Sequence, residues 1–580
     1  MLASTKSNLD EYLGAFNSAT EPFLAYTTFL GEGEIHTRTL TRGEFLRLAR
    51  KAASLIADAG CRPGDRILHC FGRNHYGDLA FRLGATMTGT VPVTVNWQAD
   101  TVERVLFKAA LTTPALIVTD GVYDADILAA LRAHHSQVPV VPLDDLDAAG
   151  ERSAELDMRD SDDKSTRIVI FTSGTTGQPK GVQLPYRSYR TNRATFEALI
   201  GVRPEDSLAA VIVNPLHHTN STAITDWMLR RPGARIHLLE RYSTPYWRIL
   251  ADVVDMGYDR IVAPTVSRHF DFLAELDAGG RLPLDGEALK AAMAQTDFLI
   301  GSAPVGPTTI ERLQHYAGRI PTVRFGSTET CLQVLGIPAE LDDAGRMDCF
   351  ERGWHHSQAN GEKLCGYYVG RPTAPFTEAR IVHSITPGDA DFLRDTPAGV
   401  PGYMITRGEN IMSGYVGNPQ ATAEVLHDVW YTGLKDIAFR LRNPADGQWD
   451  YYWLSRDSAL LIRGGTNYAY AQINDELSHF LRTQFGIEEA DFDLAVVGLK
   501  IHSEHEDSCC VTIELRGEAM AQKEALESDF VALAAKAVSK GSRPDHIRFA
   551  PIPKNFKGAI LVPDLKAGFE EHLGTAHSLP

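Results

Sequence analysis

The sequence predicts an α/β protein with a large N-terminal domain of parallel-rich sheets covered by helices, which includes a β-rich subdomain, and a small, mobile α+β C-terminal domain. Three observations carry this prediction. The chain has 580 residues, which is too many for one ordinary core. Strand-like and helix-like patterns alternate to about residue 330, as they do in parallel sheets covered by helices. Strands separated by Gly/Pro turns then follow from Gly366 to Arg440.

The first elements are predicted from hydrophobic periodicity and capping residues. Thr41–Ala59 carries apolar residues at helical spacing, and Thr41 with Glu44 forms a capping-box pattern at its start. Short apolar runs bounded by turn residues are typical of buried strands. These patterns predict a strand at Asp65–Cys70, a helix at Tyr76–Thr88, and strands at Ala115–Thr119 and Val138–Leu143.

A separate domain is expected at the C-terminal end of the chain. After Leu454 the pattern predicts a helix at Ile473–Phe485, strands at Leu494–Gly498 and Ser508–Leu515, and a helix at Asp529–Ser539. This stretch is long enough for a domain of its own. We therefore predict a large domain over residues 1–454, a hinge over 455–460 and a small domain over 461–580.

Composition limits the functions that the chain can have. The apolar content of 44% and the charged content of 23% are those of a globular protein. The net charge of −17 argues against general binding to nucleic acid or to an anionic membrane, because both are polyanions. The seven cysteines form no CxxC pair, and the sequence shows neither a signal peptide nor a long apolar run. We expect a cytoplasmic protein with reduced thiols.

The strongest chemical signal is a loop rich in glycine and hydroxyl side chains. The strand-like run Arg167–Phe171 leads into the sequence TSGTTGQPKG, which spans Thr172–Gly181. Glycines let successive backbone N–H groups point at one anion, hydroxyls add donors, and Lys180 supplies a positive charge. Because Lys180 follows a proline and precedes a glycine, the loop does not match a Walker-type P-loop. The predicted phosphate-binding residues are Thr172, Ser173, Gly174, Thr175, Thr176, Gly177 and Lys180.

Three further motifs follow the loop in order. They are Pro215-Leu216-His217-His218-Thr219-Asn220, Gly301-Ser302-Ala303-Pro304 and Phe325-Gly326-Ser327-Thr328-Glu329. With the loop, they make nearly the whole chain resemble the superfamily of adenylate-forming enzymes, which comprises acyl-CoA synthetases, peptide-synthetase adenylation domains and firefly luciferase. The resemblance implies that a carboxylate is joined to AMP with release of pyrophosphate, and that a thiol then displaces AMP.

The resemblance also implies a role for each motif. His218 would line the acyl pocket and gate the tunnel for the pantetheine arm of CoA. The residues beside the adenine and the acyl group would be Gly301, Ser302, Ala303 and Pro304. Phe325, followed by Gly326, would flank the adenine. Thr328 would bond the α-phosphate and Glu329 would coordinate Mg²⁺, which suits a reaction that develops negative charge on that phosphate.

The ribose contact is implied by a match further along the chain. Arg407–Tyr415 and Asn418–Thr422 resemble the family stretch that leads to a ribose-binding Thr-Gly-Asp. That tripeptide reads here Thr432-Gly433-Leu434-Lys435-Asp436. Because a carboxylate can accept both ribose hydroxyl protons, Asp436 is the candidate for this contact.

Two matches fall near the predicted hinge. Ser455-Arg456-Asp457-Ser458-Ala459 lies on the family's Gly-Arg-x-x-Asp hinge, where Arg456 keeps the nucleotide-facing arginine and Ala459 replaces the carboxylate. Gly464 and Gly465 match a Gly-Gly loop that, in the family, moves into the active site for thioester formation. Small residues are needed there because the pantetheine arm passes close to the backbone.

The sharpest departure from the family lies near the C-terminus. The family pattern Pro-Lys-Thr-x-x-Gly-Lys reads here Pro553-Lys554-Asn555-Phe556-Lys557-Gly558-Ala559. Ala559 replaces the lysine that reaches the substrate carboxylate and the α-phosphate, and Val562 replaces a family arginine. Losing such a charge costs about 10²–10³ in rate.

Three explanations of this departure stay open. An engineered Lys→Ala change would explain Ala559 but neither Ala459 nor Val562. A register shift would let Lys557 act as the catalytic lysine, because its side chain is long and its loop mobile. Natural divergence would explain all the departures together, with adenylation weakened or lost and thioester formation kept.

The leading hypothesis is an acyl-CoA ligase that forms a thioester from an acyl-adenylate and CoA, with acyl-AMP or ATP, CoA and Mg²⁺ as its ligands. The adenylate would be made by the chain itself or supplied by a separate adenylating enzyme, as in the platensimycin-type antibiotic pathways that the pattern resembles. The alternatives are a complete ATP-dependent carboxylic acid–CoA ligase that uses Lys557, and a pseudoenzyme that binds nucleotide or acyl ligand. Luciferase-like oxygenation and the loading of a carrier-protein arm are also compatible with the motifs. Neither nucleic acid nor a membrane is an expected partner.

Overall fold

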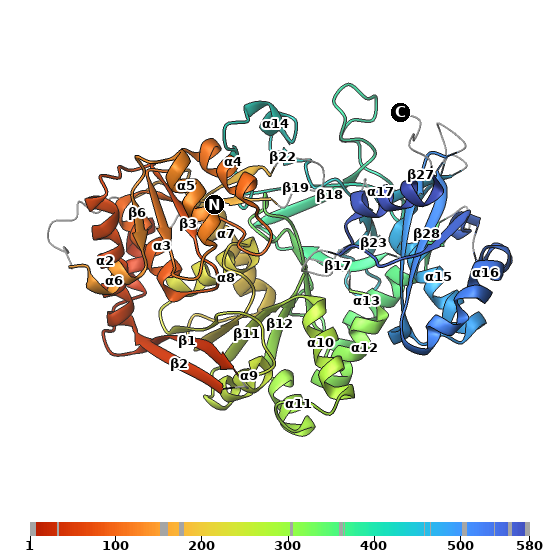
Figure 1. The fold of residues 1–580 in the computed structure, drawn as a ribbon, viewed down its shortest axis with the longest axis horizontal. Helices are drawn as coiled ribbons and strands as arrows, with labels where there is room; N and C mark the ends of the chain where they lie inside the picture. The colour runs from red at the N-terminus through yellow and green to blue at the C-terminus, as the bar shows by residue number, and fades with distance from the viewer. Residues whose placement is uncertain are drawn as a thin grey trace. The chain divides into compact units, whose positions relative to one another are not determined.

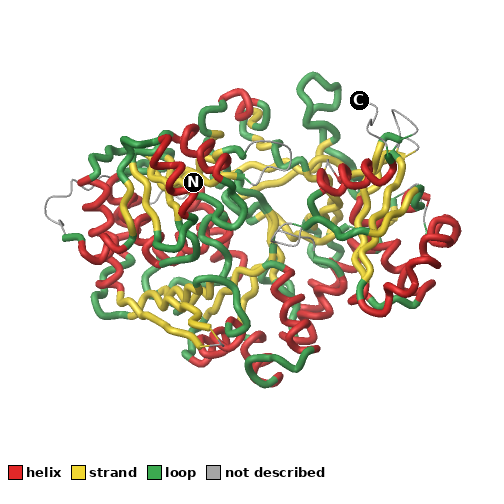
Figure 2. Tube along the Cα trace, viewed as in Figure 1, coloured by secondary structure: helices red, strands yellow, loops and turns green. Residues whose placement is uncertain are grey.

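The computed structural model describes residues 7–31, 34–150, 160–172, 179–301, 305–358, 363–364, 366–456, 459–463, 466–501, 507–538, 540–554 and 560–574 (Figure 1). Its chain divides into two compact units. The first unit comprises Met1–Met347, Val369–Ala379 and Ile405–Leu434, and the second comprises Asp348–Tyr368, Arg380–Met404 and Lys435–Pro580. Helices and strands are mixed in both units (Figure 2), which confirms the predicted α/β class. The division predicted at residues 455–460 lies within the second unit, so the hinge stays a prediction.

One sheet of the first unit leads to the phosphate loop. Its strands lie in the order β20-β8-β7-β4-β3-β5-β6. They are parallel from β7 to β6, and β8 and β20 are antiparallel additions at one edge. In chain order the strands are β3 (Arg66–Cys70), β4 (Val91–Thr94), β5 (Leu116–Thr119), β6 (Val140–Pro142), β7 (Thr166–Phe171), β8 (Gly181–Pro185) and β20 (Gly414–Tyr415).

A second sheet carries the other motifs. Within the first unit its order is β2-β1-β10-β9-β11-β12-β13-β14, and the strands from β1 to β13 are parallel. The strands are β1 (Pro22–Gly31), β2 (Glu34–Thr41), β9 (Leu208–Ile212), β10 (Ala234–Leu239), β11 (Arg260–Thr265), β12 (Thr296–Ile300), β13 (Thr322–Phe325) and β14 (Leu335–Gly336). All side chains of β9 and β12 are buried, and those of β9 are all apolar, as expected for strands covered on both faces.

Capping residues mark the ends of helices in the first unit. The predicted capping box is confirmed at α2, where Thr41 Oγ1 accepts from the Glu44 N–H at 3.2 Å and Glu44 Oε2 accepts from the Thr41 N–H at 2.7 Å. The helix predicted at Tyr76–Thr88 is α3, and it ends at Gly89 with a left-handed φ of 71°. The other helices are α1 (Asn8–Gly14), α2 (Arg42–Asp58), α4 (Val102–Thr112), α5 (Ala125–His134), α6 (Asp144–Ala148), α7 (Tyr186–Ile200), α8 (Thr219–Arg230), α9 (Tyr246–Asp255), α10 (Ser267–Ala278), α11 (Gly286–Ala294), α12 (Pro307–Ala317) and α14 (Pro419–Ala423).

The stretch Gly366–Arg440 is rich in short strands, as predicted, but its segments are shared between the two units. The strands in and after this stretch are β17 (Tyr367–Pro372), β18 (Thr377–Val382), β19 (Gly402–Gly408), β21 (Leu426–His427), β22 (Trp430–Tyr431), β23 (Asp436–Arg442) and β24 (Trp449–Arg456). The elements just before it are α13 (Asp343–Trp354), β15 (His356–Ser357) and β16 (Lys363–Leu364).

The second unit has its own apolar core, formed by helices packed on a sheet in the order β27-β28-β29. Its elements are β25 (Leu460–Arg463), β26 (Thr466–Ala469), α15 (Tyr470–Phe485), β27 (Phe492–Leu499), β28 (Ser508–Leu515), α16 (Lys523–Ala537), β29 (His546–Phe549) and α17 (Val562–Leu573). The two predicted strands and the first predicted helix are therefore present. The second predicted helix, α16, begins earlier than expected, at Lys523, because the 3-10 turn Gly517–Gln522 leads directly into it.

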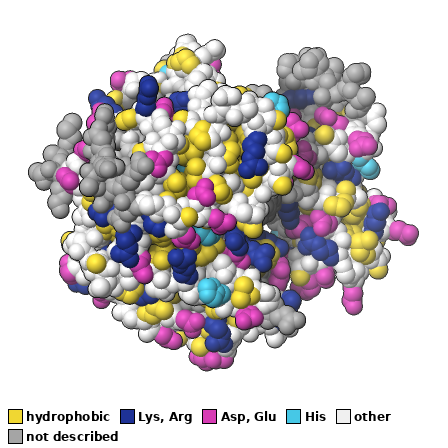
Figure 3. Space-filling view, turned by 60° about the vertical axis from the view of Figure 1, so that its left-hand side comes forward, with side chains coloured by type: hydrophobic (Ala, Val, Ile, Leu, Met, Phe, Trp, Pro, Cys, Tyr) yellow, Lys and Arg dark blue, Asp and Glu magenta, His cyan; other side chains and the backbone are white. Residues whose placement is uncertain are grey.

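The described surface mixes charges of both signs. On the face shown in Figure 3, Lys and Arg side chains alternate with Asp and Glu side chains, although the chain carries a net charge of −17. In the part of the chain that the structure describes, no helix combines the length and the apolar character needed to cross a membrane.

Candidate functional site

Three of the predicted motifs lie at one edge of the second sheet. The His218 segment follows β9, Gly301 follows β12, and Phe325 ends β13. These strands are parallel, in the order β9-β11-β12-β13. Their carboxyl ends therefore face the same edge, which is where ligands bind in parallel α/β sheets.

Gly301 and the end of β13 are in direct contact. The register pairs Leu299 with Thr322 and Ile300 with Val323. A Cβ on Gly301 would lie 3.1 Å from the carbonyl oxygen of Arg324. The two motifs therefore meet closely enough that a side chain at residue 301 would need its neighbour to move. Ser302, Ala303 and Pro304 lie outside the described residues.

A tight turn after β13 presents Thr328 and Glu329. The Ser327 N–H donates to Thr330 Oγ1 at 2.8 Å, and the Leu332 N–H donates to the Ser327 carbonyl at 2.9 Å. A Cβ on Gly326 would lie only 2.0 Å from the Leu332 carbonyl oxygen, so the turn requires glycine there. Both Thr328 and Glu329 are half-buried, which leaves them within reach of a ligand.

The ends of the phosphate loop are joined as a β-hairpin. Strands β7 and β8 pair antiparallel up to Phe171 and Gly181. Beyond this pair, the Thr172 N–H donates to the Lys180 carbonyl at 3.1 Å, and the Lys180 N–H lies 3.4 Å from Thr172 Oγ1. The hairpin thus holds Thr172 and Lys180 side by side. The predicted residues between them, Ser173, Gly174, Thr175, Thr176 and Gly177, lie outside the described residues.

Tyr415 connects the phosphate loop to Glu329. Strand β20 places Tyr415 opposite Val182, at the start of β8. The Tyr415 hydroxyl donates to Glu329 Oε1 at 3.1 Å, and the ring centroid lies 4.9 Å from Lys180 Nζ. Burial raises the pKa of Tyr415, so its hydroxyl keeps the proton that it donates. The Tyr415 side chain therefore contacts both Lys180 and Glu329, two residues that the sequence predicted separately.

The sequence did not single out Tyr415, although it lies in the quoted segment Arg407–Tyr415. The available signal was the Gly-Tyr dipeptide after a turn. Its contact with Glu329 depends on pairing β20 with β8, which are far apart in the chain.

His218 immediately precedes α8. Its Nε2 lies 3.1 Å from Nε2 of His217, whose ring packs edge-on against Trp97 at a centroid distance of 5.9 Å. His218 is half-buried, whereas His217 is buried. Packing therefore orders the two histidines on the His217 side, and His218 stays partly exposed, as expected for a residue that lines a pocket.

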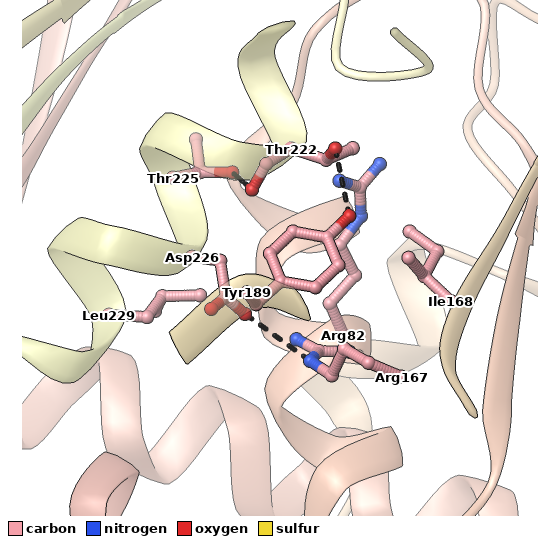
Figure 4. A pocket seen from close by; sticks show the side chains of 8 residues that line it. All are labelled: Arg82, Arg167, Ile168, Tyr189, Thr222, Thr225, Asp226 and Leu229. Atoms are coloured by element: carbon pink, nitrogen blue, oxygen red, sulfur yellow. Dashed lines mark hydrogen bonds and ion pairs between the residues drawn. The ribbon is translucent and has the colours of Figure 1, made fainter. Parts of the chain in front are cut away.

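An ion pair links helix α8 to β7, the strand that leads into the phosphate loop. Arg167 on β7 forms an ion pair with Asp226 on α8, with Nε and Oδ1 3.3 Å apart, and Arg230 Nε donates to Asp226 Oδ2 at 2.8 Å. Figure 4 shows Arg167 facing Asp226, and the Tyr189 hydroxyl directed to Thr222 Oγ1, which is 3.0 Å away. Arg167, Asp226, Tyr189 and Thr222 line a small pocket together with Arg82, Ile168, Thr225 and Leu229. The network fixes the direction of α8 and hence of His218.

In the second unit the predicted ribose and hinge residues meet. Asp436 Oδ1 accepts a 2.8 Å hydrogen bond from Trp453 Nε1 and lies 3.3 Å from Arg456 Nε. Asp436 is buried, and the Arg456 side chain is 58% exposed. The carboxylate is thus held by two donors, one of which is accessible to a ligand. Gly464, Gly465, Lys557 and Ala559 lie outside the described residues.

The residues present fit a magnesium ion bound together with a polyphosphate. The described residues hold no group of three or more His, Cys, Asp or Glu side chains placed to enclose a metal. Mg²⁺ does not require one, because it binds through one or two carboxylates, water and substrate phosphates. Glu329 is one such carboxylate, oriented by Tyr415, whose ring also contacts the loop lysine.

Comparison with known proteins agrees with this geometry. The family model of the AMP-binding enzymes matches residues 23–416. The feruloyl-CoA synthase of Amycolatopsis sp is 27% identical over 444 residues, which are 76% of this chain and 78% of that protein. The mitochondrial medium-chain acyl-CoA ligase ACSF2 of Mus musculus is 26% identical over 569 residues, covering 90% of this chain and 82% of that protein.

Solved structures share the fold. The o-succinylbenzoate CoA synthetase MenE of Bacillus subtilis, in complex with its acyl-adenylate intermediate, superposes with a TM-score of 0.73 at 18% identity, covering 97% of this chain and 98% of that chain. ATP-bound MatB of Rhodopseudomonas palustris gives a TM-score of 0.74 at 19% identity, covering 97% and 99%. Since the family model spans more than half of the sequence, the chain belongs to the AMP-binding enzymes of the adenylate-forming superfamily.

Proposed function

We propose that this AMP-binding enzyme is an acid–CoA ligase that forms a thioester from an acyl-adenylate and CoA, and that its ATP-dependent adenylation step is weakened or lost. The observation that carries the proposal is the contrast between two sites. The first unit keeps Lys180 and Glu329 gathered on Tyr415. The C-terminal segment has Ala559 where the family has its adenylating lysine. The relatives named above as acyl-CoA synthases and ligases support the thioester product.

The chemistry begins with a weak electrophile. A carboxylate resists attack by a thiol, whereas the same acyl group joined to AMP has a good leaving group. In the proposed site Thr172 and Lys180 bind the phosphate of the adenylate, and the Thr328 hydroxyl donates to it. Mg²⁺ held by Glu329 would neutralise charge on the phosphate oxygens. The thiol of CoA releases its proton to water and forms the C–S bond as the acyl C–O bond to phosphate breaks, and AMP leaves with the electron pair of that bond.

The residues proposed for the ribose and for CoA belong to the second unit. Asp436 accepts hydrogen bonds from the ribose hydroxyls, and Arg456 faces the nucleotide. Gly464 and Gly465 admit the pantetheine arm, because residues without side chains leave room next to the backbone. His218 borders the acyl group and the entry of the thiol.

The surroundings of the altered residues favour divergence over a single substitution. Ala459 and Val562 both pack against the apolar core of the second unit, among partly buried side chains. A carboxylate and an arginine at these positions would lose solvation without a gain in packing. An isolated change at Ala559 does not account for this apolar environment. Under the proposal a separate adenylating enzyme supplies the acyl-adenylate.

One experiment tests the proposal. The protein is incubated with Mg²⁺ and CoA, together with either ATP and a free acid or the corresponding synthetic acyl-adenylate, and thioester is measured by mass spectrometry. Thioester from the adenylate alone is the expected result. Thioester from ATP and free acid at a comparable rate would contradict the loss of adenylation and support the complete ligase. No thioester from either mixture would support a pseudoenzyme.

Two variants sharpen this test. Ala559→Lys restores the charge that the family uses, so we expect ATP–pyrophosphate exchange to rise. Lys557→Ala should leave consumption of the synthetic adenylate unchanged, because that step does not need the lysine. If Lys557→Ala abolished turnover from ATP and acid, Lys557 would be the adenylating residue and the register-shift alternative would hold.

A further inference from the structure

Arg324 on β13 is a buried arginine for which the described residues provide no ion-pair partner. Its side chain is only 4% exposed, and neither Nε nor Nη2 has a hydrogen-bond partner. Among the residues that the structure describes, none forms an ion pair with it. Burial lowers the pKa of the guanidinium to about 9, which leaves it charged at neutral pH. The described part of the first unit therefore offers this buried positive charge no carboxylate partner.

Two other buried arginines of the same unit are paired with carboxylates. Arg230 donates to Asp226 at 2.8 Å and to Glu11 at 2.9 Å. Arg82 donates to both carboxylate oxygens of Asp78, at 2.9 and 2.7 Å. These contacts follow the general rule that a buried charge is paired, because an isolated one loses its hydration without return. Arg324 has no such partner among the described residues, and a negatively charged ligand would provide one.

The position of Arg324 indicates where such a ligand binds. Arg324 immediately precedes Phe325 and the turn that presents Thr328 and Glu329. A Cβ on Gly301 would lie 3.6 Å from Arg324 Cγ and 3.8 Å from Cζ, so the guanidinium carbon lies against the glycine at the end of β12. Gly301 is the first residue of the segment expected beside the adenine and the acyl group. The unpaired charge therefore lies next to that segment.

We propose that Arg324 binds a second carboxylate carried by the acyl part of the substrate, so that the acids used by this enzyme are dicarboxylic acids. The planar guanidinium can donate two parallel hydrogen bonds to a carboxylate. One carboxyl group of the acid reacts and becomes the thioester, and the other stays ionised against Arg324. This inference rests on the proposed function for the reaction and adds the substrate class.

The test uses stable mimics of the adenylate. Malonyl-, succinyl-, glutaryl- and adipoyl-sulfamoyladenosine are each compared with the methyl ester of the distal carboxylate, which keeps the shape and removes the charge. Affinities are measured by titration calorimetry. We expect at least one free carboxylate to bind more tightly than its ester by about 100-fold, because a buried charge left unpaired is strongly unfavourable. In Arg324→Met this preference should vanish, with the affinity for the ester unchanged.

Stability gives a second measurement. Arg324→Met removes the uncompensated charge and keeps an apolar side chain of similar length, so the melting temperature should rise in the absence of ligand. Arg346→Met is the matched control, because Arg346 is also buried but donates to the Leu341 carbonyl at 2.9 Å and the Ile320 carbonyl at 3.1 Å. Arg346→Met should melt at a lower temperature than the wild type and keep the preference for the free carboxylate over its ester.

Three results would overturn the proposal. The first is equal affinity for both members of every pair, and the second is a preference that survives Arg324→Met. The third is an equal loss of affinity for acid and ester in Arg324→Met, which would mean that the guanidinium serves the AMP part. Binding needs no turnover, so these measurements decide the role of Arg324 even if no thioester forms and the proposed function fails.

Discussion

The hydroxyl group of Tyr415 donates a 3.1 Å hydrogen bond to Oε1 of Glu329. The two residues come from different sheets, since Glu329 follows β13 and Tyr415 lies on β20. A second link joins the same segments, because the Met412 N–H donates to the Glu329 carbonyl at 2.8 Å. The carboxylate proposed for Mg²⁺ is thus oriented by the segment that also pairs with the phosphate-loop hairpin.

Tyr415→Phe should weaken the binding of the Mg²⁺ that supports thioester formation. The variant keeps the ring beside Lys180 and removes the hydrogen bond to Glu329, which contributes about 1 kcal/mol. We expect the Mg²⁺ concentration at half-maximal thioester formation to rise about fivefold, with the melting temperature little changed. Tyr316→Phe is the control, because it removes a tyrosine–carboxylate hydrogen bond to Asp277, 2.9 Å long, between α12 and α10. An identical Mg²⁺ dependence in Tyr415→Phe and the wild type would show that Tyr415 does not orient Glu329.

Gly326→Ala should disrupt the turn that presents Thr328 and Glu329. The new Cβ would lie 2.0 Å from a main-chain oxygen of Leu332, and main-chain atoms cannot rotate away as a side chain can. A displacement of about 1 Å at a reacting group costs on the order of 10²-fold, so kcat/KM for the acyl-adenylate should fall by that factor. Gly286→Ala is the control, because a Cβ there meets nothing within 4 Å. An unchanged kcat/KM in Gly326→Ala would show that the turn adjusts to a side chain at residue 326.

Asp436→Asn should weaken binding of the nucleotide. The amide oxygen can still accept the Trp453 N–H, so the local fold is kept, but the charge facing Arg456 is lost. A neutral amide is also a poorer acceptor for the ribose hydroxyls, and we expect a loss of about tenfold in affinity for AMP. Asp395→Asn, which changes an exposed pair with Arg380, is the control in the same unit. Calorimetric titration with AMP measures both, and equal affinities would remove Asp436 from the ribose site.

Acid should destabilise the first unit through three buried histidines. Burial lowers the pKa of His75 and His237 to about 3 and that of His269 to about 4. His75 Nδ1 also accepts the Gly77 N–H at 3.0 Å, which requires the neutral ring. Between pH 6.5 and 4 the unfolded chain binds protons at these sites and the folded chain does not, so stability is complete above pH 6.5 and is lost as the pH falls.

The expected slope is about 1.4 kcal/mol per pH unit for each histidine. Urea unfolding followed by circular dichroism between pH 7 and 4 measures it. His237→Phe, which keeps an aromatic ring in the same buried site, should reduce the slope by about 1.4 kcal/mol per pH unit. A slope that is the same in His237→Phe would mean that His237 is protonated in the folded protein.

Several features could be predicted from the sequence because their causes are local. The helix at Tyr76–Thr88 follows from its periodicity and from Gly89, and the capping box of Thr41 and Glu44 lies within one turn. The phosphate loop was recognisable because glycines, hydroxyls and a lysine are adjacent in the chain. Each of these depends on residues only a few positions apart.

Tertiary structure decided how those features combine. No spacing in the sequence relates Tyr415 to Glu329 or to Lys180, because the pairing of β20 with β8 brings them together. In the sequence Arg324 is one charged residue before Phe325, and only the packing around β13 shows that its guanidinium is buried with no ion-pair partner among the described residues. The sequence by itself determined which chemical groups the protein has and the elements that carry them. The folded chain determined which of these groups share one low-dielectric site, since that depends on contacts between segments far apart in the chain.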